Sequence, residues 1–223
     1  MQTASLPSRL NLPRLYAILD VDLTAARGLD PLALLEIWLA RDIRLIQLRA
    51  KTMASGPMVA LAGAIAKQVA AAGGLFLVND RADVARLAGA GGVHVGQDDL
   101  RPADVRRILG PETVVGLSTH STTQAKDALG EAASYLAIGP FAGTLTKGRP
   151  AGSPVGLADV RAVAAIAGTA GPPVVAIGGI TLAVAHEVLA AGAASVAVIS
   201  DLLTGDPSER ADAYRAALDL RRA

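Results

Sequence analysis

The chain has 223 residues, of which 52% are hydrophobic and only 3% aromatic, so its core must be built mainly from small and branched aliphatic side chains. Its 21 basic and 20 acidic residues leave a formal charge of +1, which argues against a broad electrostatic surface for DNA or RNA. The absence of cysteine excludes disulfides, thiolate nucleophiles and cysteine-ligated metal sites, and it agrees with a reducing cytosol.

The N-terminal stretch MQTASLPSRLNLPR lacks the charged start and the long apolar run of a signal peptide. No later apolar stretch is long enough to span a bilayer, so we expect a soluble cytoplasmic protein without a membrane partner. Residues 1–13, which include Pro7 and Pro13, are expected to form a loose lead-in outside the core.

Eight short apolar runs recur along the chain and are predicted to be strands of a parallel sheet. Helical periodicity follows them, with helix starts predicted at Asp30, Thr181 and Asp206. Helix ends are predicted near Gly73, Gly110 and Gly192. The eight runs are residues 15–19, 43–48, 75–78, 92–95, 113–117, 134–138, 173–177 and 195–199.

Alternation of eight strands with eight helices favours an α/β fold in which residues 1–223 form a single (β/α)8 TIM barrel, and no interdomain linker is visible. An open doubly wound sheet is the alternative, although it typically uses fewer strands. Active sites of such barrels lie at the carboxyl ends of the strands. The residues that end each run are therefore the candidates for a functional site.

The second run ends in IQLRAK, and its two-residue period predicts that Gln47, Arg49 and Lys51 share one face. Ile46 and Leu48 then face the helices. We expect the three polar side chains to line the barrel mouth, where two cations and an amide suit an anionic ligand. The alternative is a strand end that is simply solvated.

Polar and acidic residues follow the third and fourth runs. Asn79 and Asp80 close the third run, and GQDDL after the fourth run supplies Asp98 and Asp99. Carboxylate oxygens suit hard cations, so these acids beside a basic cluster suggest Mg²⁺ shared with a phosphate-bearing substrate. The alternative is that Asp80 caps the following helix and that Asn79 is a turn residue.

Two histidines and a serine lie near the fourth and fifth runs. His94 is interpreted as a hydrogen-bonded core residue, and no partner for His120 can be identified. Ser118 directly follows the fifth run without a nucleophile elbow, so it is interpreted as a binding group. With neither cysteine nor a histidine cluster, a zinc site has no support.

Two later segments carry features that suit phosphate. The Gly- and Pro-rich segment 139–157 offers hydroxyls and an ammonium group to an anionic ligand beneath a closing loop. The seventh and eighth runs end in AIGGI and AVIS, where barrels often bind a phosphate monoester. The predicted groups are Thr144, Thr146 and Lys147 in the first segment, and the backbone N–H groups of Gly179, Ile199 and Ser200 in the second.

The motifs QLRAK, NDRADVA, GVHVGQDD, GLSTH, TLTKG, VAIGGI and AVIS, in this order, resemble those of the thiamine phosphate synthase family. The resemblance runs from about Leu15 to the last helix. It implies a transferase that couples 4-amino-2-methyl-5-(diphosphooxymethyl)pyrimidine to a thiazole phosphate, giving thiamine phosphate and pyrophosphate. It also implies these ligands: Gln47, Arg49, Lys51, Asn79, Ser118 and Lys147 for the pyrimidine diphosphate; Asp80 and Asp99, with Asp98 less suitable, for Mg²⁺; Thr144, Thr146, Gly179, Ile199 and Ser200 for the thiazole phosphate.

The implied catalysis is electrostatic and dissociative, because Mg²⁺ and the cations neutralise the departing pyrophosphate and no covalent nucleophile is needed. The predicted catalytic groups are Arg49, Lys51, Ser118 and Lys147. One departure is Gly143, where the family usually has a proline before the Thr-x-Thr-Lys motif.

Two alternatives stay open. A thiazole tautomerase has the same barrel but typically lacks the acids at Asp80 and Asp99. A non-catalytic paralogue that binds a phosphorylated ligand would have no need of a complete set of metal and diphosphate ligands. The apolar helix faces are compatible with a homo-oligomer as well as with a monomer.

Overall fold

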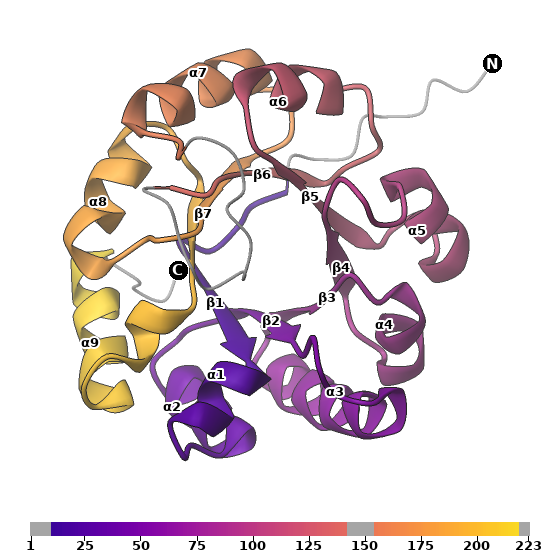
Figure 1. Ribbon diagram of the computed structural model, residues 1–223, viewed down its shortest axis with the longest axis vertical. Coiled ribbons are helices and arrows are strands. Elements are labelled where there is room, and N and C mark those ends of the chain that lie inside the picture. The colour runs from indigo at the N-terminus through magenta and orange to yellow at the C-terminus, as the bar shows by residue number, and fades with distance from the viewer. Residues whose placement is uncertain (1–9, 142–153, 219–223) are drawn as a thin grey trace.

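The computed structural model describes residues 10–141 and 154–218, in which eight parallel strands close into a barrel (Figure 1). Each strand pairs with the next along the chain, and β1 pairs with β8 to close the ring. The predicted TIM barrel is therefore confirmed. The strands are β1 (Leu15–Asp20), β2 (Leu45–Arg49), β3 (Leu75–Asn79), β4 (Gly92–Val95), β5 (Val114–Thr119), β6 (Tyr135–Ile138), β7 (Val174–Ile177) and β8 (Ser195–Val198).

Helices form a ring outside the strands (Figure 1). Asp30 and Asp206 cap helices as predicted, with Asp30 Oδ1 accepting the Ala33 N–H at 2.8 Å. A short helix after β1 was not expected, so the described residues contain nine α-helices instead of eight. The helices are α1 (Val21–Ala26), α2 (Pro31–Ala40), α3 (Ser55–Ala71), α4 (Ala82–Ala88), α5 (Pro102–Leu109), α6 (Thr122–Ala128), α7 (Leu157–Ala167), α8 (Leu182–Ala190), the 3₁₀ helix η1 (Ser200–Leu203) and α9 (Pro207–Ala217).

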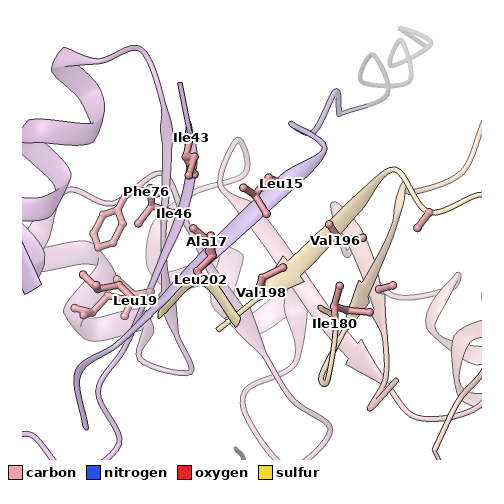
Figure 2. Packing of buried hydrophobic residues seen from close by; sticks show 14 of the residues in the cluster. Leu15, Ala17, Leu19, Ile43, Ile46, Phe76, Ile180, Val196, Val198 and Leu202 are labelled. Atoms are coloured by element: carbon pink, nitrogen blue, oxygen red, sulfur yellow. The ribbon is translucent and has the colours of Figure 1, made fainter. Parts of the chain in front are cut away.

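Alternate residues of each strand face two different cores, because side chains of a strand point in turn to opposite sides. In β1, Leu15, Ala17 and Leu19 belong to the core between the barrel and the helices (Figure 2). Tyr16 and Ile18 belong to a second core inside the barrel. All five side chains are at most 2% exposed. The barrel interior is thus filled, so a ligand must bind at its mouth.

The N-terminal segment contributes to the interior core. Leu12, which lies three residues before β1, is 7% exposed and belongs to the same cluster as Tyr16 and Leu45. The expectation that residues 1–13 lie outside the core is therefore wrong at Leu12, because the starting end of the barrel needs an apolar cover. No helix of the described ranges is long and apolar enough to cross a membrane.

Candidate active site

The polar face of β2 leads from the barrel interior to the mouth. Gln47 is 1% exposed, Arg49 is 9% exposed, and the Lys51 side chain just beyond the strand is 51% exposed. Ile46 and Leu48 belong to the helix-facing core, which confirms the alternation predicted from the sequence. The three polar side chains therefore lie at successive depths along one line.

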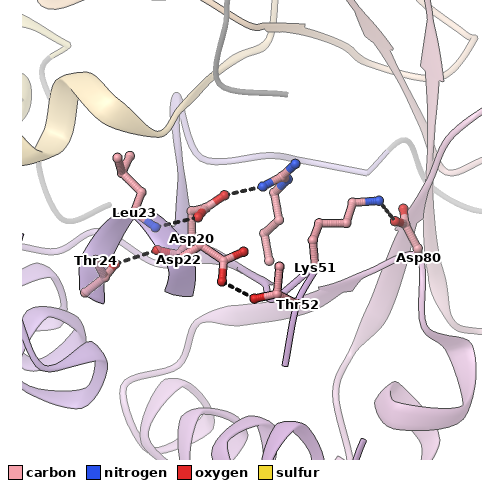
Figure 3. A network of polar contacts seen from close by, with 8 residues as sticks. Asp20, Asp22, Leu23, Thr24, Lys51, Thr52 and Asp80 are labelled. Carbon is pink, nitrogen blue, oxygen red and sulfur yellow. Dashed lines mark hydrogen bonds and ion pairs between the residues drawn. The ribbon is translucent and has the colours of Figure 1, made fainter. Parts of the chain in front are cut away.

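Arg49 is held by an ion pair with Asp20, the last residue of β1. The two residues are partners in the strand register, and both are buried. The other oxygen of Asp20, Oδ1, accepts the Leu23 N–H at 2.9 Å and caps α1 (Figure 3). Asp20 was not singled out from the sequence, although an acid follows the first apolar run just as Asp80 follows the third. Asp20 fixes the guanidinium at the mouth.

Lys51 forms an ion pair with Asp80, just after β3 (Figure 3). Asp80 does not cap α4, because Arg81 occupies the N-cap position. The alternative interpretation of Asp80 as a helix cap is therefore wrong. Asp80 has a positive φ of 63°, which is uncommon outside glycine and turns its side chain out of the strand pattern. Asn79 is half-buried at the end of β3 and lies opposite His94 in the register.

Asp80 also lies against Asp99, which follows β4. Burial raises the pKa of Asp80 above its ordinary value of 3.8, a hydrogen bond and ion pair with Lys51 lower it, and the charge and hydrogen bond of Asp99 raise it again. The Gly96 N–H donates to Asp99 Oδ2 at 2.8 Å and fixes that carboxylate. Asp98 is exposed. Two carboxyl groups this close repel unless they share a proton or a cation.

The Asp80–Asp99 pair fits Mg²⁺, which favours oxygen ligands and often binds one or two carboxylates together with substrate phosphates and water. Within residues 10–141 and 154–218, no three carboxylates or imidazoles gather into a larger metal-binding group. A magnesium ion on this pair would therefore take its remaining ligands from the substrate and from water.

Ser118 and Gln47 are connected through the barrel interior. Ser118 Oγ lies 2.8 Å from His94 Nε2, and His94 Nδ1 lies 2.8 Å from the Tyr135 hydroxyl. The Tyr135 hydroxyl lies 3.0 Å from that of Tyr16, which accepts a hydrogen bond from the Gln47 amide. The interpretation of His94 as a hydrogen-bonded core residue is confirmed, since it is 3% exposed.

His120 supports the backbone after β6. Its Nδ1 lies 2.7 Å from the Gly139 carbonyl oxygen, which supplies the partner that the sequence did not identify. Phe141 and Val155 form a β-bridge on either side of segment 142–153. Four residues named from the sequence lie in that segment, outside the described residues: Gly143, Thr144, Thr146 and Lys147.

The loops after β7 and β8 leave the barrel side by side, because these strands are paired. Gly178 and Gly179 have positive φ values of 83° and 74°, and consecutive residues of unusual backbone conformation can turn N–H groups toward an anion. The Ile199 side chain is buried in the interior core, so only its backbone is available to a ligand. Ser200 opens η1. The predicted phosphate ligands therefore follow adjacent strands.

Asp201 holds these loops to two helices. Its carboxylate accepts the Leu182 N–H at 2.9 Å, the Arg210 guanidinium at 2.6 and 2.7 Å, and the Tyr214 hydroxyl at 2.5 Å. Thr181 was predicted to cap α8, but its side chain makes no cap hydrogen bond. The cap comes instead from Asp201, which lies 19 residues away from Leu182 in the sequence.

The known proteins similar to this chain include thiamine-phosphate synthases. A family model described as thiamine monophosphate synthase matches residues 15–202, which include all eight strands. The thiamine-phosphate synthase of Koribacter versatilis is 43% identical over 212 residues, covering 93% of this chain and 96% of that protein. The enzyme of Moorella thermoacetica is 40% identical over 189 residues, covering 85% and 87%. The solved thiamine phosphate pyrophosphorylase of Pyrococcus furiosus has a TM-score of 0.79 at 28% identity, covering 92% and 95%.

Proposed function

Because the chain belongs to the thiamine monophosphate synthase family, we propose that it is a thiamine-phosphate synthase, a transferase of thiamine biosynthesis with small-molecule substrates. It would couple 4-amino-2-methyl-5-(diphosphooxymethyl)pyrimidine to a thiazole phosphate and release pyrophosphate. The observation that carries this proposal is the arrangement of the mouth, where Lys51 contacts the Asp80–Asp99 pair and Arg49, two residues earlier on the same face of β2, is held by Asp20. Cations next to a candidate magnesium site suit a diphosphate substrate.

We propose Mg²⁺ as the cofactor, held by Asp80 and Asp99. When bound, it would neutralise charge on the diphosphate and on the departing pyrophosphate. The two carboxylates would then have a shared cation in place of mutual repulsion. Lys51, which pairs with Asp80, is half-exposed on a flexible stem, so its ammonium can turn toward a bound diphosphate.

The protein's own residues supply position and charge rather than a nucleophile. Arg49 is preorganised by Asp20, so its N–H groups need no rearrangement as negative charge develops on the leaving group. The electron-rich aminopyrimidine can stabilise a cationic methylene carbon, which makes a dissociative substitution the proposed route. Lys147, Thr144 and Thr146 are proposed from the sequence as further anion ligands.

The thiazole phosphate is proposed to bind the backbone N–H groups of Gly179, Ile199 and Ser200. Anchoring the phosphate there would hold the thiazole nitrogen in line with the methylene carbon, which converts a bimolecular encounter into an oriented reaction. The fixed geometry of η1, secured through Asp201, supports this role. A cytoplasmic location and a homo-oligomer stay predictions.

The test is formation of thiamine phosphate by the purified protein from both substrates, with and without Mg²⁺. Asp80→Asn is the decisive variant, because asparagine tolerates the positive φ and loses only the charge. We expect metal-dependent product in the parent and at least about a hundredfold lower activity in the variant, with its fold retained by circular dichroism. Asp98→Asn is the matched control and should stay active.

A parent protein that binds thiazole phosphate but forms no product would contradict the proposal and favour the tautomerase or the non-catalytic paralogue. Loss of the folded state in Asp80→Asn would assign Asp80 a structural role instead of a metal-binding one.

A further inference from the structure

A continuous chain of hydrogen bonds crosses the barrel interior from β2 to β5. It runs through five side chains, each from a different strand, and every one is at most 4% exposed. Successive contacts are 2.5, 3.0, 2.8 and 2.8 Å long. In order, the members are Gln47, Tyr16, Tyr135, His94 and Ser118. The two ends of this chain are residues proposed above to hold the pyrimidine.

Each of the three internal members, Tyr16, Tyr135 and His94, can donate one hydrogen bond to a neighbour in the chain of hydrogen bonds. A hydroxyl donates one hydrogen bond, and a neutral imidazole donates from one nitrogen and accepts at the other. Burial raises the pKa of both Tyr16 and Tyr135 well above the ordinary value, so both hydroxyls keep their protons. If each buried hydroxyl hydrogen is donated to one of its two neighbours, all links point the same way along the hydrogen-bond chain.

The Gln47 amide nitrogen donates to Tyr16, which sets the direction. The direction then follows for contacts that are themselves undirected: Tyr16 would donate to Tyr135, Tyr135 to His94 Nδ1, and His94 Nε2–H to Ser118 Oγ. At the two ends, the Gln47 carbonyl oxygen remains as an acceptor and the Ser118 O–H remains as a donor. The two ends therefore have opposite hydrogen-bonding character.

The packing around Tyr135 leaves room for this chain of hydrogen bonds and fixes the rings that form it. A Cβ at position 116 would lie 2.1 Å from Tyr135 Cζ and 2.5 Å from His94 Nδ1, so only glycine leaves room for both rings. The Tyr135 and His94 rings stack with centroids 5.6 Å apart, and Tyr16 meets Tyr135 edge-on at 6.1 Å. Aromatic contacts of these kinds favour fixed ring orientations.

We propose that Tyr135 is a positioning residue that sets the donor and acceptor ends of this chain to match an aminopyrimidine. The amino group of that ring would donate to Gln47, and a ring nitrogen would accept from Ser118. Tyr135 acts only through Tyr16 and His94, which are its partners in the chain. This inference rests on the proposed function. It adds a means by which the site distinguishes an amino from an oxo pyrimidine, because an oxo pyrimidine has an acceptor where the amino group donates and a ring N–H donor where the ring nitrogen accepts.

The first test is spectroscopic and does not depend on catalysis. Protein labelled with ¹⁵N-histidine should show His94 as the Nε2–H tautomer, whose signals are assigned with His120→Gln and His186→Gln variants. Tyr135→Phe removes the donor to Nδ1, so a mixture of tautomers is expected. A His94 tautomer protonated at Nδ1 in the parent, or one unaffected by Tyr135→Phe, would overturn the inference.

The second test compares the pyrimidine diphosphate with its 4-oxo analogue in steady-state kinetics. Tyr135→Phe should raise KM for the amino substrate about tenfold, change kcat less than about threefold, and reduce the preference for amino over oxo about tenfold. Tyr214→Phe, which removes another buried hydroxyl, is the matched control and should keep the parent's preference.

Tyr16→Phe breaks the neighbouring link and should reproduce the loss of preference, which covers the case in which Tyr135→Phe fails to fold. An active parent whose preference survives both changes would refute the inference alone. A parent without activity would refute the proposed function, while the tautomer measurement would still decide the direction of the chain.

Discussion

The ionised side chains at the mouth are arranged in pairs. Arg49 is paired with Asp20 beneath the mouth, and Lys51 is paired with Asp80 at its rim. Transfer of an ion from water into a protein costs several kcal/mol, and removal of one partner leaves the other uncompensated. The pairs therefore keep cations ready for an anionic substrate.

Asp20→Asn should lower the free energy of unfolding by about 3 kcal/mol, because it keeps the cap oxygen for Leu23 but leaves Arg49 without a buried counter-charge. Pyrophosphate should recover part of this loss by replacing the missing anion. Urea unfolding with and without pyrophosphate measures both effects. Asp104→Asn, which breaks the exposed pair with Arg107, is the control and should cost less than about 1 kcal/mol. An equally small cost for Asp20→Asn would contradict the prediction.

Asp80 makes the stability of the folded protein depend on pH. Its folded-state pKa is raised above 3.8, so the stability from this group is fully present below pH 3.8 and is lost as pH rises through the raised pKa. Without metal, Asp80→Asn should therefore melt at least about 2 °C above the parent at pH 7, and the difference should be smaller at pH 4. Thermal unfolding in EDTA checks this, with Asp98→Asn as control. A difference that does not grow with pH would contradict the raised pKa of Asp80, which is caused first by burial and then by Asp99.

At the scale of elements, Asp201 joins η1 to the start of α8 and to α9. The 3₁₀ turn that carries Ser200 is short and has no side-chain cap of its own. Its position therefore depends on the Asp201 carboxylate, which is neutralised by Arg210. The rigidity of the proposed phosphate-binding loop depends on the same contacts of Asp201.

Asp201→Asn should cost about 3 kcal/mol of unfolding free energy and weaken binding of thiazole phosphate, because Arg210 loses its charged partner and a single amide oxygen replaces the two that serve Leu182, Arg210 and Tyr214. Asp212→Asn is the matched control, since its ion pair with Arg41 is half-exposed and should contribute within about 0.5 kcal/mol. Chemical denaturation and calorimetric titration give the two quantities. Equal effects of both variants would show that Asp201 is an ordinary surface pair.

At the scale of the whole molecule, closure of the barrel fills its interior with side chains from all sides. Tyr135 from β6 meets Tyr16 from β1, although 119 residues separate them. Their rings leave no space beside Gly116, so the interior tolerates no added volume at that position.

Gly116→Ala should destabilise the protein by about 3 kcal/mol, because its Cβ would overlap the Tyr135 ring. Gly63→Ala, in the middle of α3 with no atom within 4 Å of the added Cβ, should instead stabilise it by about 0.5–1 kcal/mol. Urea unfolding of both variants measures the contrast. A neutral Gly116→Ala would mean that the interior rings can move apart.

The sequence by itself determined the eight strands, the inward and outward faces of β2, and which polar residues stand at the strand ends. These features are local, because a two-residue period and the residue after a strand can be read within one segment. The roles of the predicted ligands stay predictions, and Thr144, Thr146 and Lys147 lie outside the described residues.

Only the tertiary structure decided the partners. Asp20 meets Arg49, and Asp201 rather than Thr181 caps α8, because closure and helix packing bring together residues far apart in the chain. The interior hydrogen-bond chain arises in the same way. Each of five strands contributes only one member, so no single segment of the sequence reveals it. Strand periodicity specifies which side a residue faces, whereas the closed ring specifies what it meets there.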